Sequence, residues 1–190
     1  MPSVFVLYAG YRYAWDAAAV GLALALVGGL NILVQGLLVR PVIARIGELR
    51  ALLVGLVFGA AGFIMHGLAP NGTLFLGGVV LYAPIGFAGP AVQTLMTKRV
   101  GPKEQGLLQG ANASIIGLTG VLGPAIFTLI YAFFIGHQAP VQLPGAPFLL
   151  AALLMLLAAS VAVRVGRDET HRIPASSDQD ASWSPSQTTA

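Results

Sequence analysis

The side chains of this chain that could contact a small molecule are amides set within long apolar stretches. Asn31 and Gln35 lie four residues apart in the apolar run 17 to 39, so in a helix they share one face. An uncharged polar side chain in an apolar environment is costly unless it is hydrogen-bonded. Two interpretations therefore stay open: the amides line a substrate cavity, or they bond to a neighbouring helix. Gln93, Gln109 and Asn112 in later runs are candidates for the same cavity.

One apolar run is interrupted by residues that disturb a helix. Two prolines and two glycines fall close together in the run 73 to 97, namely Pro84, Gly86, Gly89 and Pro90. This run is predicted to kink. A kinked helix beside a binding site can act as a gate, or the kink can simply be tolerated because neighbours satisfy the freed carbonyls.

Two sets of glycines predict close contact between helix backbones. Small residues at spacings of three or four let two membrane helices approach each other. The sets are a GxxxG step formed by Gly55 and Gly59, and a longer seam formed by Gly106, Gly110 and Gly117. His66, near the end of the run 50 to 69, is interpreted as a hydrated histidine rather than a proton carrier.

The reactive residue types of the chain exclude most other chemistry. There is no cysteine, so neither a disulfide nor a thiolate metal site can form. The three histidines lie far apart in the sequence, and no catalytic dyad, phosphate loop or metal cluster is visible. We therefore expect no enzyme activity, no cofactor and no bound metal. No Asp, Glu, Lys or Arg lies in the middle of an apolar run, so an intramembrane carboxylate for ion coupling would have to come from outside this chain.

The elements that position these residues are predicted to be membrane-spanning helices. Of 190 residues, 56% are hydrophobic and 9% are charged, a balance that excludes an ordinary soluble fold. Each main run exceeds the roughly 18 residues that cross a bilayer; the runs are 17 to 39, 50 to 69, 73 to 97, 105 to 135 and 146 to 165. A transmembrane β-barrel would instead need segments of about ten residues with alternating hydrophobicity, whereas these runs are continuously apolar. We predict an all-α integral membrane protein with five full transmembrane helices after an N-terminal helix stub.

The basic residues predict the orientation of these helices. If the helices alternate, every Lys and Arg except Arg12 falls on one side of the membrane. By the positive-inside rule that side is cytoplasmic, so we expect a multi-pass protein of the inner (cytoplasmic) membrane with a cytoplasmic C-terminus. Residues 1–165 are predicted to form the transmembrane bundle, and the polar residues 166–190 a disordered cytoplasmic tail. The net charge is only +3 and forms no basic face, so membrane lipids are expected partners and nucleic acid is not.

The order of kinked, polar-faced and apolar helices resembles the C-terminal half of a major facilitator superfamily transporter, most of all the tetracycline/proton antiporter group of drug exporters. Arg45 and Gly47 retain part of the cytoplasmic loop motif of that superfamily. The segments that carry the resemblance are, in chain order, Tyr11-Arg12-Tyr13 with Trp15, Gly21 through Gln35, Arg45-Ile46-Gly47-Glu48, Gly86 with Pro90-Ala91-Val92-Gln93, Gln105-Gly106 with Leu108-Gln109-Gly110, and Gly123-Pro124 with Ile130-Tyr131-Ala132.

The resemblance implies a C-terminal six-helix bundle of the major facilitator fold, in which residues 1–10 end a truncated helix seven and the later spans are helices eight to twelve. It implies export of an amphipathic drug such as tetracycline in exchange for protons, by alternating access between two halves. The implied partners are a small amphipathic substrate, the proton and an N-terminal transporter half missing from this chain. Gly59 and Asn31 stand where the tetracycline exporters carry an acidic residue and a histidine. On this interpretation the chain is a fragment, the product of a misplaced start codon or a truncated gene, and it should not transport alone.

A second class of function stays open from the sequence. Glycine seams can also bind partner helices, so the chain could be a non-transporting membrane protein that acts as an assembly or interaction subunit. A co-purifying partner that contains no transporter half would favour this alternative.

Overall fold

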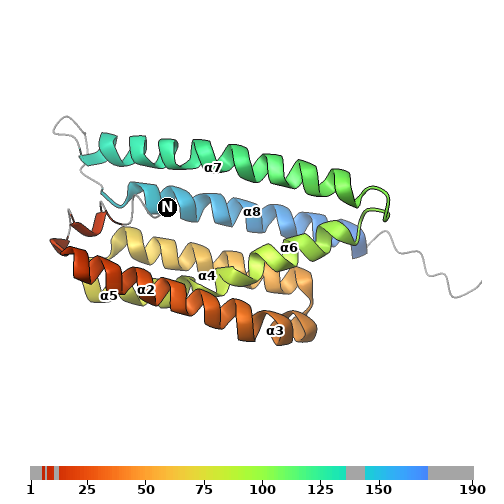
Figure 1. The fold of residues 1–190 in the computed structure, drawn as a ribbon, viewed down its shortest axis with the longest axis horizontal. Coiled ribbons are helices and arrows are strands. Elements are labelled where there is room, and N and C mark those ends of the chain that lie inside the picture. The colour runs from red at the N-terminus through yellow and green to blue at the C-terminus, as the bar shows by residue number, and fades with distance from the viewer. Residues whose placement is uncertain (1–5, 7, 11–12, 136–143, 171–190) are drawn as a thin grey trace, which may run out of the picture.

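The fold is a bundle of long helices that run along one another (Figure 1). The structure is a computed structural model that describes residues 6, 8–10, 13–135 and 144–170. Within these ranges the chain forms helices and no strand. The spans long and apolar enough to cross a membrane are Ala17–Ile46, Glu48–Leu68, Gly72–Thr97, Gln105–Phe134 and Ala146–Arg167. The predicted all-α membrane fold with five full spans is therefore confirmed.

The first span is longer than its apolar run and changes its winding. It consists of α2 (Ala17–Leu33), the π-helical segment η1 (Val34–Leu38) and α3 (Val39–Ile46). Helix α2 begins at Asp16, whose carboxylate accepts a hydrogen bond from the backbone N–H of Ala19 at 2.8 Å, a common helix start. The predicted end of this helix at residue 39 is wrong, since the helix continues through Arg40 and Arg45 to Ile46. Long basic side chains such as these can reach the membrane surface from a helix end.

A single glycine connects this span to the next. Gly47 has φ 81° and ψ 163°, a backbone conformation that is essentially restricted to glycine. The next helix, α4 (Glu48–Leu68), begins at the following residue. The expected cytoplasmic loop is therefore a sharp turn at Gly47, and Arg45 lies in the last turn of α3.

The interrupted span is broken where the prolines and glycines predicted it. It runs as α5 (Gly72–Tyr82), the 3₁₀ segment η2 (Ala83–Phe87) and α6 (Ala88–Thr97). Pro84 lies in the first turn of η2, where its missing N–H removes a donor from the helical ladder. The tighter 3₁₀ winding thus separates two α-helical halves of one span.

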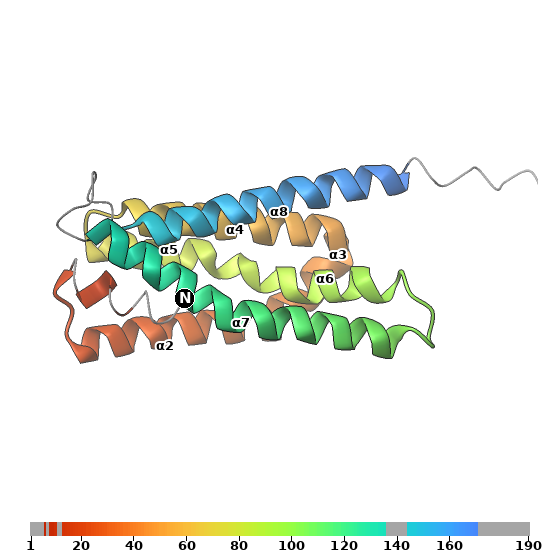
Figure 2. The same cartoon turned by 90° about the horizontal axis from the view of Figure 1, so that it is seen from above.

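The last two helices differ in how they pack. Helix α8 (Ala146–Thr170) lies along α4 (Figure 2). Ala151, Ala152 and Ala159 are buried, while the leucines of its other face are exposed. Helix α7 (Gln105–Ile135) has no buried residue in its most apolar 18-residue stretch. It has small contacts with α8 and α6, and it crosses the bundle at an angle to α8 (Figure 2).

The first residues of the predicted tail, 166–170, are helical. Helix α8 continues to Thr170, three residues beyond Arg167, where the candidate membrane span ends. The rest of the predicted tail, 171–190, lies outside the described residues, as do residues 1–5 and 7 of the predicted stub.

An aromatic cluster packs one end of the bundle. Tyr8 of the stub and Phe75 of α5 are fully buried, with ring centroids 5.6 Å apart. The ring of His66 lies 4.5 Å from Phe75 and 5.7 Å from Phe148 of α8. His66 is only 5% exposed, so its interpretation as a hydrated histidine is wrong. The rings that cover it come from the next helix and from α8.

Candidate substrate-binding site

Two of the five predicted cavity amides meet across the interface of α6 and α7. The Asn112 side-chain N–H donates to Gln93 Oε1 at 3.4 Å. Both side chains are half-buried and border an open cavity of about 460 Å³. The rest of the wall is apolar apart from Gly89, and includes Leu52, Leu56, Ala88 and Ile116. An apolar pocket with a few convergent polar groups is the usual form of a small-molecule site.

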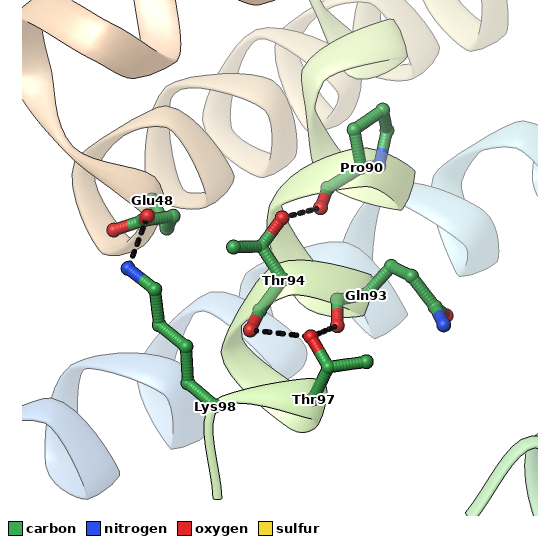
Figure 3. Close-up of polar contacts among 6 residues, drawn as sticks. All are labelled: Glu48, Pro90, Gln93, Thr94, Thr97 and Lys98. Carbon is green, nitrogen blue, oxygen red and sulfur yellow. Dashed lines mark hydrogen bonds and ion pairs between the residues drawn. The ribbon is translucent and has the colours of Figure 1, made fainter. Parts of the chain in front are cut away.

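Helix α6, the second half of the broken span, presents Gln93 to this cavity. Its two threonines bond within their own helix: Thr94 Oγ1 donates to the Pro90 carbonyl at 2.9 Å, and Thr97 Oγ1 to the Gln93 carbonyl at 3.0 Å. Figure 3 shows the Gln93 side chain pointing away from the side on which Lys98 reaches Glu48. The threonine hydroxyls are thereby satisfied locally, and Gln93 is the side chain of this group that extends towards α7.

A second amide pair lies on the first span, around the change of winding. The Asn31 side-chain N–H donates to the Val27 carbonyl at 3.0 Å, and Gln35 Nε2 donates to Asn31 Oδ1 at 3.4 Å. These two residues, with Ile32 and Gly36, line a wide shallow cavity of about 420 Å³. The described contacts thus keep both amides bonded within their own span and beside an open surface. Gln35 itself belongs to the π-helical segment, a feature often found at functional sites.

The two irregular segments, η1 and η2, pack against each other. Val34 of η1 is buried, and a Cβ placed on Gly86 of η2 would lie 2.9 Å from its Cγ1 atom. The glycine therefore permits the close approach. By contrast, Gly89 has no atom of another described element within 4 Å of such a Cβ and borders the amide cavity.

The glycine step of α4 lies against the broken span. A Cβ on Gly55 would lie 3.1 Å from the Pro84 carbonyl oxygen, and one on Gly59 would lie 2.8 Å from Ile85 Cδ1. Gly62, one turn further, is tighter still: its Cβ would lie 2.7 Å from Tyr82 Cβ. Backbones approach closely along this face.

The glycine seam of α7 does not pack within the described residues. Added Cβ atoms on Gly106, Gly110 and Gly117 would meet nothing within 4 Å, because α7 has only a small contact with α6 and α8. The predicted packing of this seam against protein therefore stays a prediction, since no described element contacts it. Gln109 on the same helix is exposed and is not brought to the Gln93–Asn112 pair by any described contact.

An ion pair joins α4 and α6 at the end of the bundle that carries the loop motif. Lys98 Nζ lies 2.5 Å from Glu48 Oε1, with side chains 60% and 26% exposed. Glu48 directly follows Gly47, so the turn places its carboxylate beside the end of α6 (Figure 3). Sequence reasoning missed this pair, although two opposite charges at helix ends predicted on the same side were a usable signal. The described residues contain no cluster of His, Asp and Glu able to hold a metal ion.

Comparison with known proteins agrees with this architecture. The sequence profile of the Major Facilitator Superfamily matches residues 1–189. The chain belongs to this superfamily. The predicted resemblance is therefore confirmed. Members of the superfamily are multi-pass membrane transporters rather than enzymes.

The relatives of this superfamily chain include several tetracycline resistance proteins. It is 34% identical over 130 residues to the class C protein of Escherichia coli. The matched stretch covers 68% of this chain and 33% of that protein. It is 31% identical over 164 residues to the class D protein of Salmonella ordonez, covering 85% and 40%. Hippocampus abundant transcript-like protein 1 of Bos taurus is 27% identical over 175 residues, covering 85% and 35%. The chain thus spans between a third and two fifths of the length of these relatives.

Proposed function

We propose that this chain forms one wall of the substrate cavity in a secondary active transporter that exports amphipathic drugs, such as tetracycline, in exchange for protons. The other wall is an N-terminal transporter half outside this chain. The observation that carries the proposal is the Gln93–Asn112 pair beside an open, otherwise apolar cavity of about 460 Å³. Relatives named as tetracycline resistance proteins support the choice of substrate class.

The amides are suited to exchange their hydrogen bonds for those of a substrate. The contact between Gln93 and Asn112, and the one between Gln35 and Asn31, are both 3.4 Å long, beyond the usual 2.7–3.2 Å for such bonds. Replacing a weak bond with a bond to a polar ligand atom costs little. The surrounding Leu52, Leu56 and Ile116 side chains offer apolar contact to the rest of an amphipathic molecule.

The irregular segments support an alternating-access mechanism. Broken helices border the substrate site in many transporters, and here the 3₁₀ segment immediately precedes the half-helix that carries Gln93. The π-helical segment carries Gln35 and packs on the 3₁₀ segment. Changes of winding at these two places would move both amide pairs.

Proton coupling by a carboxylate would come from the other half. The acidic residues of the described helices lie at helix ends: Asp16 precedes α2, Glu48 begins α4, Glu104 precedes α7, and Asp168 and Glu169 lie in the last turn of α8. None lies in the middle of a span, where proton-carrying carboxylates of transporters are found.

Efflux measured in a joined transporter tests the site. The chain is fused to the N-terminal half of a class C tetracycline resistance protein, and tetracycline efflux from cells is followed by fluorescence. We expect Gln93→Ala and Asn112→Ala to slow efflux, with smaller losses for the equivalent changes at Asn31, Gln35 and Gln109. Unchanged efflux in all five variants, at wild-type expression, would remove the site assignment. The chain alone should give no efflux.

One observation favours a second function, that of a non-transporting interaction subunit. Helix α7 presents Gly106, Gly110 and Gly117 without a packing partner among the described elements, and a small-residue seam suits a partner helix. Purification of the tagged chain from membranes separates the two proposals. A stoichiometric partner that contains no six-helix transporter half would support the subunit function.

A further inference from the structure

Gln93 and Lys98 lie on opposite sides of the same helix. Lys98 caps the end of α6 in a helical conformation, five residues after Gln93. At about 100° per residue, their side chains leave the helix axis about 140° apart. Figure 3 shows Lys98 reaching Glu48 of α4 while Gln93 points away from that pair. A contact that draws Lys98 towards α4 therefore turns Gln93 towards Asn112 of α7, to which it is bonded.

Side-chain packing holds the first part of α6 more firmly than its last turns. Ala91 is fully buried, and a Cβ on Gly55 of α4 would lie 3.3 Å from the backbone nitrogen of Ala88. Further along, Val92 and Leu95 border a cavity of about 370 Å³, and Val92 also borders the amide cavity of about 460 Å³. A side chain beside such a space has fewer contacts to fix its position. The direction of the last turns thus depends more on polar contacts.

The Glu48–Lys98 ion pair is a polar contact that ties these last turns to another helix. Lys98 Nζ lies 2.5 Å from Glu48 Oε1. The hydroxyls of Thr94 and Thr97 bond to carbonyls of α6 itself, so they do not fix α6 against its neighbours. Glu48 follows the turn at Gly47 directly, which fixes the place of its carboxylate at the start of α4.

We propose that Lys98 is a positioning residue for Gln93: its ion pair with Glu48 holds α6 in the orientation that presents the Gln93 amide to Asn112 and the cavity. This inference rests on the proposed function, in which Gln93 meets the substrate. The side chains of the pair are 60% and 26% exposed. An exposed pair shifts an equilibrium by about two- to five-fold. A contact of that size favours one orientation of α6 and still lets the helix move during transport.

Cross-linking of introduced cysteines tests the orientation of α6 in the full chain. The chain has no cysteine, so two introduced cysteines form a unique pair. One variant carries Gln93→Cys with Asn112→Cys. The other carries Thr94→Cys with Asn112→Cys, and Thr94 points about 100° further around the helix. A short bis-methanethiosulfonate reagent joins the cysteines in membranes, and trypsin cleavage at the basic residues between them reveals whether the fragments stay joined.

Changes at Lys98 should alter the two cross-linking rates in opposite directions. Lys98→Gln should slow the reaction of the 93–112 pair about two- to five-fold and speed that of the 94–112 pair. Lys98→Arg, which keeps the charge, should leave both rates as they are. Lys103→Gln is the matched control, because it removes an equal charge from the exposed connection between α6 and α7, and it should change neither rate.

Two cross-linking results would overturn the proposal. One is an effect of Lys98→Gln no larger than that of Lys103→Gln. The other is an equal fall for both cysteine pairs, which would indicate general loosening of the bundle without a change of orientation. Circular dichroism verifies that each variant is folded, and the Lys98→Arg variant keeps the test valid if Lys98→Gln does not fold.

Efflux by the joined transporter then tests whether Lys98 acts through Gln93. Lys98→Gln should raise the tetracycline concentration for half-maximal efflux about two- to five-fold, with no further rise when Gln93→Ala is already present. An equal rise in both backgrounds would contradict action through Gln93. If Gln93→Ala alone leaves efflux unchanged, the proposed substrate site fails, whereas the cross-linking rates still decide whether Lys98 orients α6.

Discussion

The contact between α4 and α5 at Gly62 gives a sharp test of the fold. A Cβ on Gly62 would lie 2.7, 2.8 and 2.9 Å from Cβ, Cα and N of Tyr82. Two of these atoms are backbone, so Gly62→Ala must push the helices apart. Overpacking of this kind costs about 1–3 kcal/mol. Gly117→Ala is the matched control, since Gly117 also lies inside a long helix but an added Cβ there meets nothing within 4 Å.

The comparison of the two variants isolates the packing cost. Each change gains up to about 1 kcal/mol of helix propensity, and this gain cancels in the difference. We therefore expect Gly62→Ala to be about 1–3 kcal/mol less stable than Gly117→Ala. The assay is unfolding of the purified chain in mixed micelles with increasing dodecyl sulfate, followed by circular dichroism. Equal unfolding midpoints, or a lower midpoint for Gly117→Ala, would refute the close approach of α4 and α5.

Three further changes test other parts of the structure. Gly47→Ala should lower the unfolding free energy by about 1–3 kcal/mol because φ 81° and ψ 163° strain any other residue; a loss no larger than that of Gly101→Ala in the same assay would contradict this. His66→Phe should leave stability unchanged or raise it, because both ring nitrogens are buried without a hydrogen-bond partner among the described residues; a loss above about 1 kcal/mol would reveal a partner. Exchanging Glu48 and Lys98 for each other should restore the stability lost in either single charge reversal, more clearly at low salt; additive losses would exclude the ion pair.

The sequence predicted those parts of the fold that depend on local composition. The spans follow from the length of the apolar runs, and the break at Pro84 follows from a residue that cannot donate a backbone hydrogen bond. The extension of the first span through Arg45 did not follow. Hydropathy decides which residues lie in lipid, and a helix that continues beyond the lipid leaves no apolar signal.

The parts that failed depend on contacts between different helices. His66 is buried because Phe75 of the next helix and Phe148 of α8 cover it, and hydropathy does not show that packing of the helices brings these rings onto it. The π-helical winding at Gln35 has no marker in residue type. For the candidate site, the residue types were predicted but not their grouping: Gln93 meets Asn112, whereas Gln109 on the same helix as Asn112 stays exposed.

The 3₁₀ segment Ala83–Phe87 links the winding of the backbone to the direction of a side chain. Each 3₁₀ residue turns about 120° and rises about 2.0 Å, against about 100° and 1.5 Å in an α-helix. Rewinding these five residues as α-helix would rotate α6 by about 100° and draw it in by about 2.5 Å relative to α5. A quarter turn of that size would carry Gln93 away from Asn112, so a small local change of pitch would suffice to switch which helix face the cavity meets.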